Sequence, residues 1–320
     1  MTTNMIIETM KNTQANISSI TADSITSIVS LPSKVKSTKF VVFNDKVYVG
    51  SEDYNEENTG TSAYLHIFDL TGSLINSIPV SKYNGSHISD LRVIDNSLYF
   101  MAVSGDEHGA KIQLCKLTTD EDFSILSEEP TSYISDVALL VKFNAQIWVM
   151  GTIAGEGFVR AYLFNGDKLE PKVDIPVTDD FSQNYKYEMI SSGEYIYISF
   201  EEHYDFFDGG VLKFNPETFE YTRLFSGSCH SLFGSTSSDH GIMFTCMNDN
   251  YSQQYYYTND FGITPRTLIN EEVFSIRFVG EYIVYVRANG EVHKIHPLTH
   301  HDDIIGNLPE FDKVTCVEVI

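Results

Sequence analysis

The hydrophobic and polar positions of the chain follow one short pattern that returns six times. A turn residue and one or two polar residues precede a tight apolar run with an aromatic near its centre, as in Asn144-Ala145-Gln146-Ile147-Trp148-Val149. The six leading turn residues are Asn44, Asp95, Asn144, Gly193, Asp239 and Gly280, which stand 51, 49, 49, 46 and 41 positions apart. A β-rich repeat of roughly 40 to 50 residues predicts a β-propeller.

Each unit reads as four strands joined by turns. One strand precedes the recurring turn, as in residues 91–94, and the apolar run after it forms the second, as in residues 147–150. The second strand is apolar on both faces, which is typical of a sheet that neighbouring sheets cover on both sides. A third strand and a weaker outer strand follow turns rich in Asp, Asn and Gly. No stretch shows sustained helical periodicity, so the predicted class is all-β.

The two ends of the chain are expected to close the ring together. Residues 5–10, 16–21 and 25–32 are short β-prone pieces, and residues 314–320 form a terminal strand. An unpaired sheet edge is a template for aggregation, so we predict a seventh blade in which residues 314–320 are the innermost strand. The alternative is six blades with an N-terminal arm. In the seven-blade prediction, residues 1–320 form one domain. Residues 1–38 complete the ring, residues 39–310 contain the six blades visible in the sequence, and residues 311–320 contain the closing strand.

One hairpin carries a family resemblance. Thr258-Asn259-Asp260-Phe261-Gly262-Ile263-Thr264 resembles the Asp-box of sialidases and other propellers with bacterial-neuraminidase repeats, although Pro265 stands where that pattern has Trp. The resemblance covers seven residues and implies a propeller, because in that family the box is a folding element remote from the active site. Sialidase chemistry also needs an arginine triad, and only Arg92 and Arg277 lie on predicted inner strands.

The charge balance narrows the range of partners. The chain has 21 basic and 44 acidic side chains and a net charge of −23, which disfavours nucleic acid and anionic membranes. It shows no apolar run long enough to span a membrane and no signal-peptide pattern, so synthesis in the cytoplasm is expected. The four cysteines have no metal-type spacing, and Cys115, Cys246 and Cys316 fall in apolar strands, where free buried thiols are expected.

The loops between the second and third strands are the leading candidates for a binding surface. All should emerge on one face of a propeller, and their acids would make that face negative and able to attract a basic protein partner. A solvated rim without a ligand is the alternative. The predicted partner-binding residues are Glu52, Asp53, Glu56, Glu57, Asp106, Glu107, Glu201, Glu202, Asp205 and Asp208.

Bound metals and catalytic groups have weaker signals. Calcium would need six to eight oxygens, and only Asp90 and Asp136 stand at inner strand positions, so no cofactor is predicted and calcium stays an alternative. His293, His296, His300 and His301 form the densest histidine group, but residues three apart on a strand point to opposite faces. No nucleophile motif is found, so no catalytic residue is assigned.

These observations favour a non-enzymatic interaction or structural protein that docks a partner on its acidic face. The acidic composition, rich in Asn, Ser, Thr, Ile and Tyr, suits a component of a virion or bacteriophage tail. Two alternatives remain open: a calcium-assisted propeller hydrolase or lyase acting on a sugar or lactone, and a carbohydrate-binding module. Convergent carboxylates or arginines at the inner strands would favour the enzyme.

Overall fold

The computed structural model contains strands and turns, with no helix among the residues it describes. Those residues are 5–11, 14–20, 24–32, 35, 37–54, 60–106, 109–131, 138–153, 158–176, 188–201, 208–228, 236–238, 241–247, 253–258, 266–269, 273–279, 282–296, 299, 301–311 and 313–319. Within them no helix is long and apolar enough to cross a membrane. The chain divides into two compact units, one of residues 29–183 and one of residues 1–28 with 184–320.

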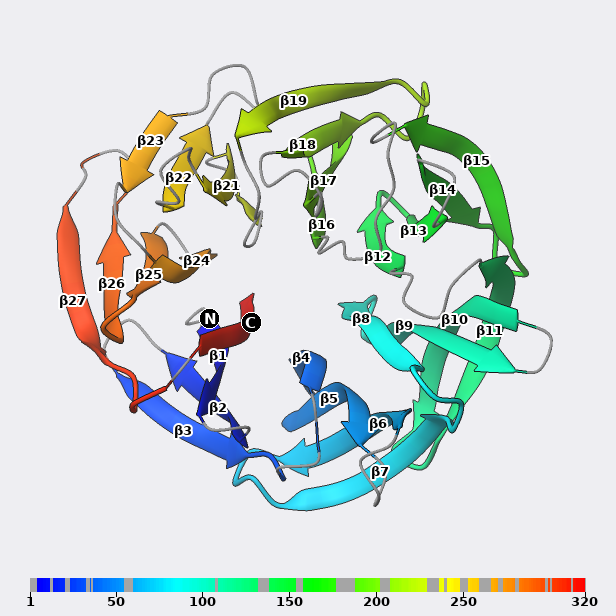
Figure 1. Ribbon diagram of the computed structural model, residues 1–320, viewed down its shortest axis with the longest axis horizontal. Helices are drawn as coiled ribbons and strands as arrows, with labels where there is room; N and C mark the ends of the chain where they lie inside the picture. The colour runs from blue at the N-terminus through cyan, green and yellow to red at the C-terminus, as the bar shows by residue number, and fades with distance from the viewer. Residues whose placement is uncertain are drawn as a thin grey trace. The chain divides into compact units, whose positions relative to one another are not determined.

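Unit 29–183 holds three four-stranded antiparallel sheets, each with its strands in chain order (Figure 1). The first contains β4 (Ser37–Phe43), β5 (Lys46–Tyr54), β6 (Thr61–Asp69) and β7 (Leu74–Ser81). The second contains β8 (His87–Ile94), β9 (Ser97–Asp106), β10 (Gly109–Thr119) and β11 (Asp122–Thr131). The third contains β12 (Ala138–Phe143), β13 (Gln146–Ile153), β14 (Phe158–Phe164) and β15 (Leu169–Pro176).

The other unit holds four sheets of the same kind. One contains β16 (Glu188–Ser192), β17 (Tyr195–Glu201), β18 (Asp208–Phe214) and β19 (Tyr221–Ser228), and the next contains β20 (Thr236–Ser238), β21 (Gly241–Met247), β22 (Gln253–Thr258) and β23 (Arg266–Ile269). A third contains β24 (Val273–Val279), β25 (Tyr282–Arg287), β26 (Glu291–Ile295) and β27 (Asp302–Asn307).

The seventh sheet joins the two ends of the chain. Its order is β28 (Lys313–Val319), β1 (Met5–Lys11), β2 (Gln14–Ile20) and β3 (Ile25–Ser30). β28 pairs antiparallel with β1, with Val319 opposite Met5, and Figure 1 shows the two strands side by side. The prediction of a seventh sheet built from both termini, with the C-terminal strand at its end, is therefore confirmed. The prediction that residues 1–320 form one domain stays a prediction.

The recurring turns have the backbone that their residues favour. Asn44, Asp45, Asp95 and Asn96 have φ between 48° and 57°, and Gly193 has φ 57°. Two successive residues with positive φ give a turn whose twist matches that of the paired strands, and Asn, Asp and Gly adopt this conformation at the least cost. The leading residue of the repeat thus fixes the hairpin between the first two strands of a sheet.

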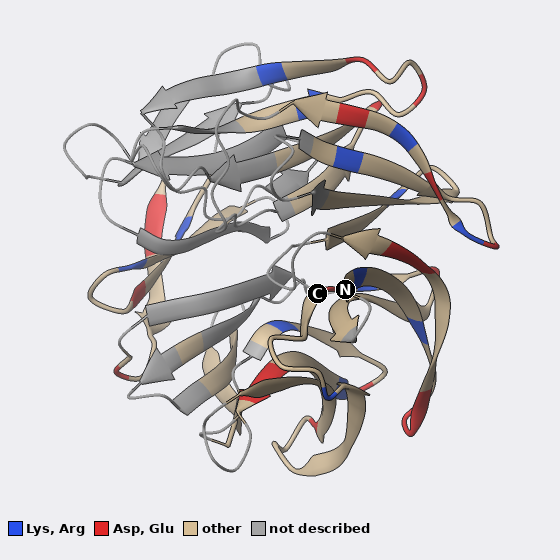
Figure 2. Cartoon of the chain, turned by 45° about the vertical axis from the view of Figure 1, so that its right-hand side comes forward, with Lys and Arg blue, Asp and Glu red and all other residues tan. Residues whose placement is uncertain are grey.

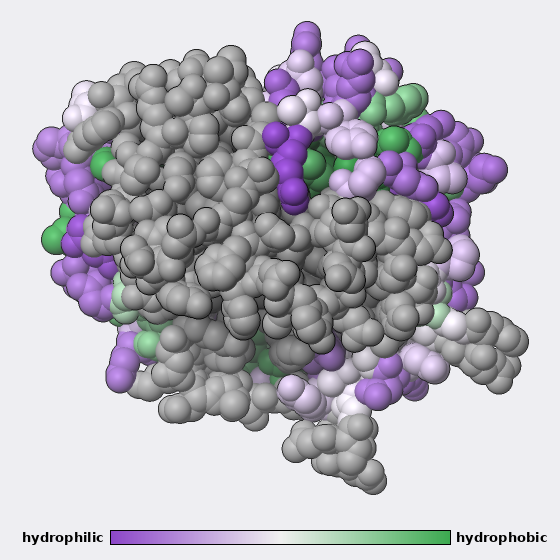
Figure 3. Space-filling model, turned by 45° about the horizontal axis from the view of Figure 1, so that its top comes forward, coloured by the Kyte–Doolittle hydropathy of each residue, from purple (hydrophilic) through white to green (hydrophobic). Residues whose placement is uncertain are grey.

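The apolar faces of neighbouring sheets form the core of unit 29–183. One cluster joins Tyr48 and Leu65 of the first sheet to Leu91 and Phe100 of the second, and another joins the second sheet to the third. This packing accounts for second strands that are apolar on both faces. Exposed large hydrophobic residues occur in several elements, and Figure 3 shows small apolar groups among hydrophilic ones on the face in view. Scattered exposure of this kind is normal for a folded protein.

Candidate functional site

Two histidines occupy the same place in two different sheets. His66 in β6 pairs with Val49 of β5 and Ser77 of β7. His293 in β26 pairs with Tyr285 of β25 and Ile304 of β27. Val49 and Tyr285 each close the recurring apolar run of their sheet. Both histidines are buried, with 5% and 3% of their surface exposed, and a buried polar ring needs hydrogen-bond partners.

His66 has a hydroxyl on one side and a carboxylate on the other. Its Nδ1 lies 2.8 Å from Ser77 Oγ, and its Nε2 lies 2.9 Å from Asp53 Oδ2. The three side chains come from β7, β6 and β5, so the chain of hydrogen bonds crosses the first sheet from its outer strand inward. We call Asp53, His66 and Ser77 the first-sheet triad. A hydroxyl, an imidazole and a carboxylate in series can pass a proton from the hydroxyl to the ring.

The surroundings of the first-sheet triad fix the histidine ring. Tyr64 stacks on it with centroids 5.7 Å apart and an interplanar angle of 16°, and Phe68 lies at 6.4 Å. Asp53 is buried, and its Oδ1 has no hydrogen-bond partner among the described residues. Its Oδ2 therefore makes the carboxylate's one described polar contact, to His66.

His293 meets carboxylates on both sides. Its Nδ1 lies 3.2 Å from Asp302 Oδ1, and its Nε2 lies 3.5 Å from Glu291 Oε2, an ion-pair distance too long for a well-formed hydrogen bond. The Tyr285 hydroxyl donates to Asp302 Oδ2 at 2.8 Å, and the Tyr285 ring stacks on the imidazole at 5.0 Å. The same register position therefore carries two different chemistries: His66 lies between a hydroxyl and a carboxylate, whereas His293 lies between two carboxylates.

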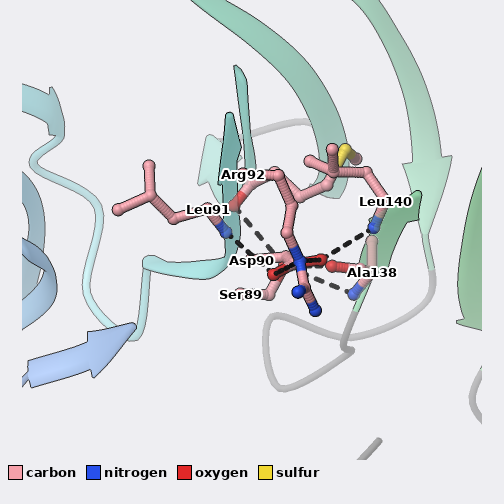
Figure 4. Close-up of polar contacts among 7 residues, drawn as sticks. Ser89, Asp90, Leu91, Arg92, Ala138 and Leu140 are labelled. Carbon is pink, nitrogen blue, oxygen red and sulfur yellow. Dashed lines mark hydrogen bonds and ion pairs between the residues drawn. The ribbon is translucent and has the colours of Figure 1, made fainter. Parts of the chain in front are cut away.

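A third polar cluster joins β8 to β12 (Figure 4). Asp90 is fully buried and accepts hydrogen bonds from the backbone N–H of Leu91 and of Leu140, both at 2.9 Å. Arg92 Nε donates to the same carboxylate at 3.1 Å. Beside it, Ser89 Oγ donates to the carbonyl of Ala138 at 2.7 Å. The pairing of β8 with β9 shifts register between Ile88 and Asp90, and at this irregularity Ser89 and Asp90 contact the neighbouring sheet.

This geometry decides what Asp90 can do. Oδ1 accepts from Leu91 and Arg92, and Oδ2 accepts from Leu140, so three N–H donors surround the carboxylate. A calcium ion would have to displace those donors. The described contacts of Asp90 therefore link two sheets and leave its carboxylate oxygens occupied by N–H donors. No group of three or more His, Cys, Asp or Glu side chains in the described part of the chain is placed to hold a metal ion.

The structure describes only part of the predicted acidic face. Glu52 lies on β5 and accepts a hydrogen bond from Thr61 Oγ1 at 3.0 Å, whereas Asp53 is buried in the first-sheet triad. Asp106, Glu201 and Asp208 lie at strand ends. Figure 2 shows the described Asp and Glu residues on strands and turns of several sheets, with Lys and Arg among them. The others lie outside the described residues: Glu56, Glu57, Glu107, Glu202 and Asp205. The acidic docking face stays a prediction.

The remaining candidates are placed as follows. Asp136, His300 and residues 259–265 of the Asp-box-like hairpin lie outside the described residues. His296 packs edge-on against Tyr282, with ring centroids 5.7 Å apart, and His301 is exposed. Arg277 lies on β24.

Sequence reasoning missed His66 and Ser77 as a pair. The signal was present in the third strand of the first unit, where a histidine stands in the apolar run Tyr64-Leu65-His66-Ile67-Phe68. A polar residue at a buried strand position demands a partner, and the hairpin to the next strand places Ser77 opposite it. The polar residues after Ser51 are typical of a loop, so the sequence places Asp53 on the surface, whereas β5 continues to Tyr54.

Comparisons with known proteins find similar solved structures, although no sequence family matches. No family model matches the chain, and no curated protein matches it. A protein of Bacteroides uniformis provisionally named a 6-phosphogluconolactonase aligns over 100% of this chain and 99% of its own, with TM-score 0.68 and 13% identity. A second such protein, from Bacteroides fragilis, aligns over 100% and 98% with TM-score 0.64 and 10% identity. The periplasmic gluconolactonase of Pseudomonas aeruginosa aligns over 100% and 99% with TM-score 0.65 and 13% identity.

These neighbours correct one conclusion and confirm another. The interpretation of the chain as a non-enzymatic structural protein of a virion or phage tail is wrong, because proteins that share its full length carry the names of lactonases. That interpretation relied on an acidic composition, which governs solubility and association and does not encode a function. The Asp-box match gains no family support, whereas the broader assignment holds. With seven four-stranded antiparallel sheets and these neighbours, the chain is a β-propeller.

Proposed function

We propose that the protein hydrolyses a lactone of a sugar acid. The observation that carries this proposal is the extent of the structural likeness. Three neighbours named as lactonases match this chain over all of its length and over 98–99% of theirs, so the likeness includes no separate domain on either side. The sequence already left a propeller hydrolase of a sugar or lactone open as an alternative. A shared fold does not define a reaction, so the proposal needs residues able to perform it.

Lactone hydrolysis makes defined demands on those residues. An oxygen nucleophile attacks the carbonyl carbon, the ring C–O bond breaks, and the product is a hydroxy acid. A base must take the proton of the nucleophile and an acid must supply one to the departing ring oxygen. Imidazole performs both roles near neutral pH. Of the two buried histidines, His66 is the one whose ring joins a carboxylate to a hydroxyl.

His293 fits these demands less well. Its ring nitrogens face the carboxylates of Asp302 and Glu291, and neither residue offers a hydroxyl whose proton the ring could take. His293 instead holds β25, β26 and β27 together with Tyr285 and Arg287. Since it is equally buried and has the same register, it serves as the matched control for His66.

The experiment measures release of acid from gluconolactone and from its 6-phosphate in weakly buffered solution. Lactones open spontaneously, so the comparison is the rate with and without the chain. We expect the wild-type protein and His293→Gln to accelerate opening, and His66→Gln to lose at least about a hundredfold of that acceleration. Equal loss in both variants, each shown to be folded by circular dichroism, would contradict a specific role of His66 in the reaction. Parallel assays with EDTA and with calcium test the calcium-assisted version of the proposal.

A further inference from the structure

We propose that Ser77 is a nucleophile and that the protein works through a covalent acyl-enzyme at this residue. The inference rests on the proposed function for its reaction class, acyl transfer from an oxygen ester. The choice of Ser77 rests on the first-sheet triad alone. The expected substrates are lactones and, by the same chemistry, simple carboxylic esters. The sequence carries no Gly-x-Ser-x-Gly motif, so only geometry points to this serine.

The hydrogen bonds set the direction of proton transfer. An ionised carboxylate only accepts, so the His66 Nε2 that lies 2.9 Å from Asp53 Oδ2 carries the proton. In the neutral ring the other nitrogen, Nδ1, is then an acceptor. Ser77 Oγ lies 2.8 Å from that nitrogen and donates its proton to it. This is the arrangement of an activated serine, with the two ring nitrogens exchanged relative to the usual protease triad.

Burial leaves one end of the triad within reach of a substrate. His66 and Asp53 have side chains 6% and 7% exposed, whereas Ser77 is half-buried. Of the three residues, Ser77 is therefore the one that a small molecule in solution reaches most readily. Tyr64 and Phe68 hold the imidazole in place, so the serine needs no rearrangement to be bonded to its base. A prearranged base is what separates an activated serine from an ordinary one.

The position of Ser77 also provides hydrogen-bond donors for the reaction. β7 stands at the end of the strand order β4-β5-β6-β7, so its second edge has no partner strand within that sheet. On such an edge every second backbone N–H points away from the sheet. An N–H that has no partner strand within this sheet therefore lies at Ser77 or at a residue next to it. Donors in that place can stabilise the negative charge that develops on the carbonyl oxygen.

The proposed step balances without a further reactant. Ser77 Oγ bonds to the carbonyl carbon as its proton passes to His66 Nδ1, and the ester C–O bond breaks as Nδ1 returns that proton to the leaving oxygen. Water then attacks the acyl group and gives a proton to Nδ1. The bond between the acyl carbon and Oγ breaks, and Ser77 recovers its proton. The sum is one lactone and one water giving one hydroxy acid, with no change in oxidation state.

A purely structural role predicts different behaviour. A serine that only satisfies a buried histidine would be unreactive, and its loss would lower stability alone. Ser81 provides the comparison within the same strand, because its hydroxyl lies 2.9 Å from Ser86 Oγ and within the described residues contacts no histidine. Any reactivity that arises from exposure on β7 would appear at Ser81 as well as at Ser77.

The test is covalent labelling of the full chain with a fluorophosphonate, followed by mass spectrometry of the digested protein. We expect one adduct, on Ser77, that is absent from Ser77→Ala, unchanged in Ser81→Ala and at least about tenfold slower in Asp53→Asn. An acetyl group on Ser77 after rapid quenching from 4-nitrophenyl acetate would identify the intermediate. A folded wild-type protein that shows no adduct at Ser77 overturns the inference, and this needs no variant. Lactone hydrolysis that persists in Ser77→Ala would overturn it too, yet leave the proposed function standing.

Discussion

The carboxylate of Asp90 and the backbone N–H of Leu140 are joined by a hydrogen bond of 2.9 Å that links β8 of one sheet to β12 of the next. Ser89 makes a second link at the same point, to Ala138 (Figure 4). Apolar side chains also pack between these two sheets, but such contacts are not directional. The hydrogen bonds of Asp90 and Ser89 are directional and therefore favour one register between the two sheets.

Replacing Asp90 should therefore destabilise the fold strongly. Asp90→Ala leaves Arg92 beside an emptied buried site and the Leu140 N–H without its acceptor, so a loss of about 3–5 kcal/mol in the free energy of unfolding is expected. Chemical denaturation measures it. The control is Asp95→Asn, which breaks an ion pair with Lys142. The Lys142 side chain is 37% exposed and the Asp95 side chain 68% exposed, so this change should alter the free energy of unfolding by less than about 1 kcal/mol. An equally small effect at Asp90 would show that the link carries little of the stability.

Asp120 should make stability depend on acid pH. It accepts hydrogen bonds from Lys46 and Tyr48, and the Lys46 bond most of all holds the pKa of this carboxyl below its ordinary 3.8. Because the folded-state pKa is lowered, the stabilisation is complete above the ordinary value and is lost as the pH falls through the folded value. The difference in unfolding free energy between wild type and Asp120→Asn should thus be present at pH 7 and fade below about pH 4. A difference that stays constant over this range would contradict the assigned cause.

Cys115 should be unreactive until the protein unfolds. Its side chain is fully buried, and burial raises the pKa of the thiol far above its usual range, so almost no thiolate forms. We expect iodoacetamide to leave the Cys115 peptide unmodified in the native protein and to alkylate it in guanidinium chloride. Mass spectrometry of the digested protein follows this residue separately from the other three cysteines. Fast alkylation under native conditions would mean that the core between the first two sheets opens readily.

Gly50 should resist substitution because β5 approaches β8 closely there. A Cβ at this position would lie 2.7 Å from Cγ2 and 2.9 Å from Cβ of Ile88. Gly50→Ala should cost about 1–3 kcal/mol by overpacking. Combining it with Ile88→Ala removes the Cγ2 contact and leaves the Cβ contact, so the double variant should be less destabilised than the sum of the two single changes. Simple additivity would mean that the two strands separate to accept the methyl group.

The sequence was sufficient to predict the fold class and the way the ends of the chain meet. The repeat after Asn44, Asp95 and Asn144 follows local physics, since positive-φ turns and strands apolar on both faces leave a direct trace in residue type. The closing sheet followed from the need to pair the strand at residues 314–320, and β28 pairs with β1 as expected.

The candidate site was harder to predict because its members are brought together by register. Asp53, His66 and Ser77 are separated by 13 and 11 residues and belong to three strands. Only the pairing of β5, β6 and β7 brings them into contact, and a shift of one residue would send His66 to the opposite face. Asp90 was placed correctly on an inner strand, but the sequence could not show that backbone N–H groups of β8 and β12 would occupy its carboxylate.

Lactone hydrolysis is tested most directly by the initial rate of ring opening of gluconolactone and its 6-phosphate with the purified full chain, compared with the same protein after heat denaturation. We expect the native protein to accelerate ring opening saturably over spontaneous hydrolysis, and the denatured sample to give no acceleration. A native protein that leaves both lactones, and a wider panel of sugar lactones, opening at the spontaneous rate would contradict the proposed function.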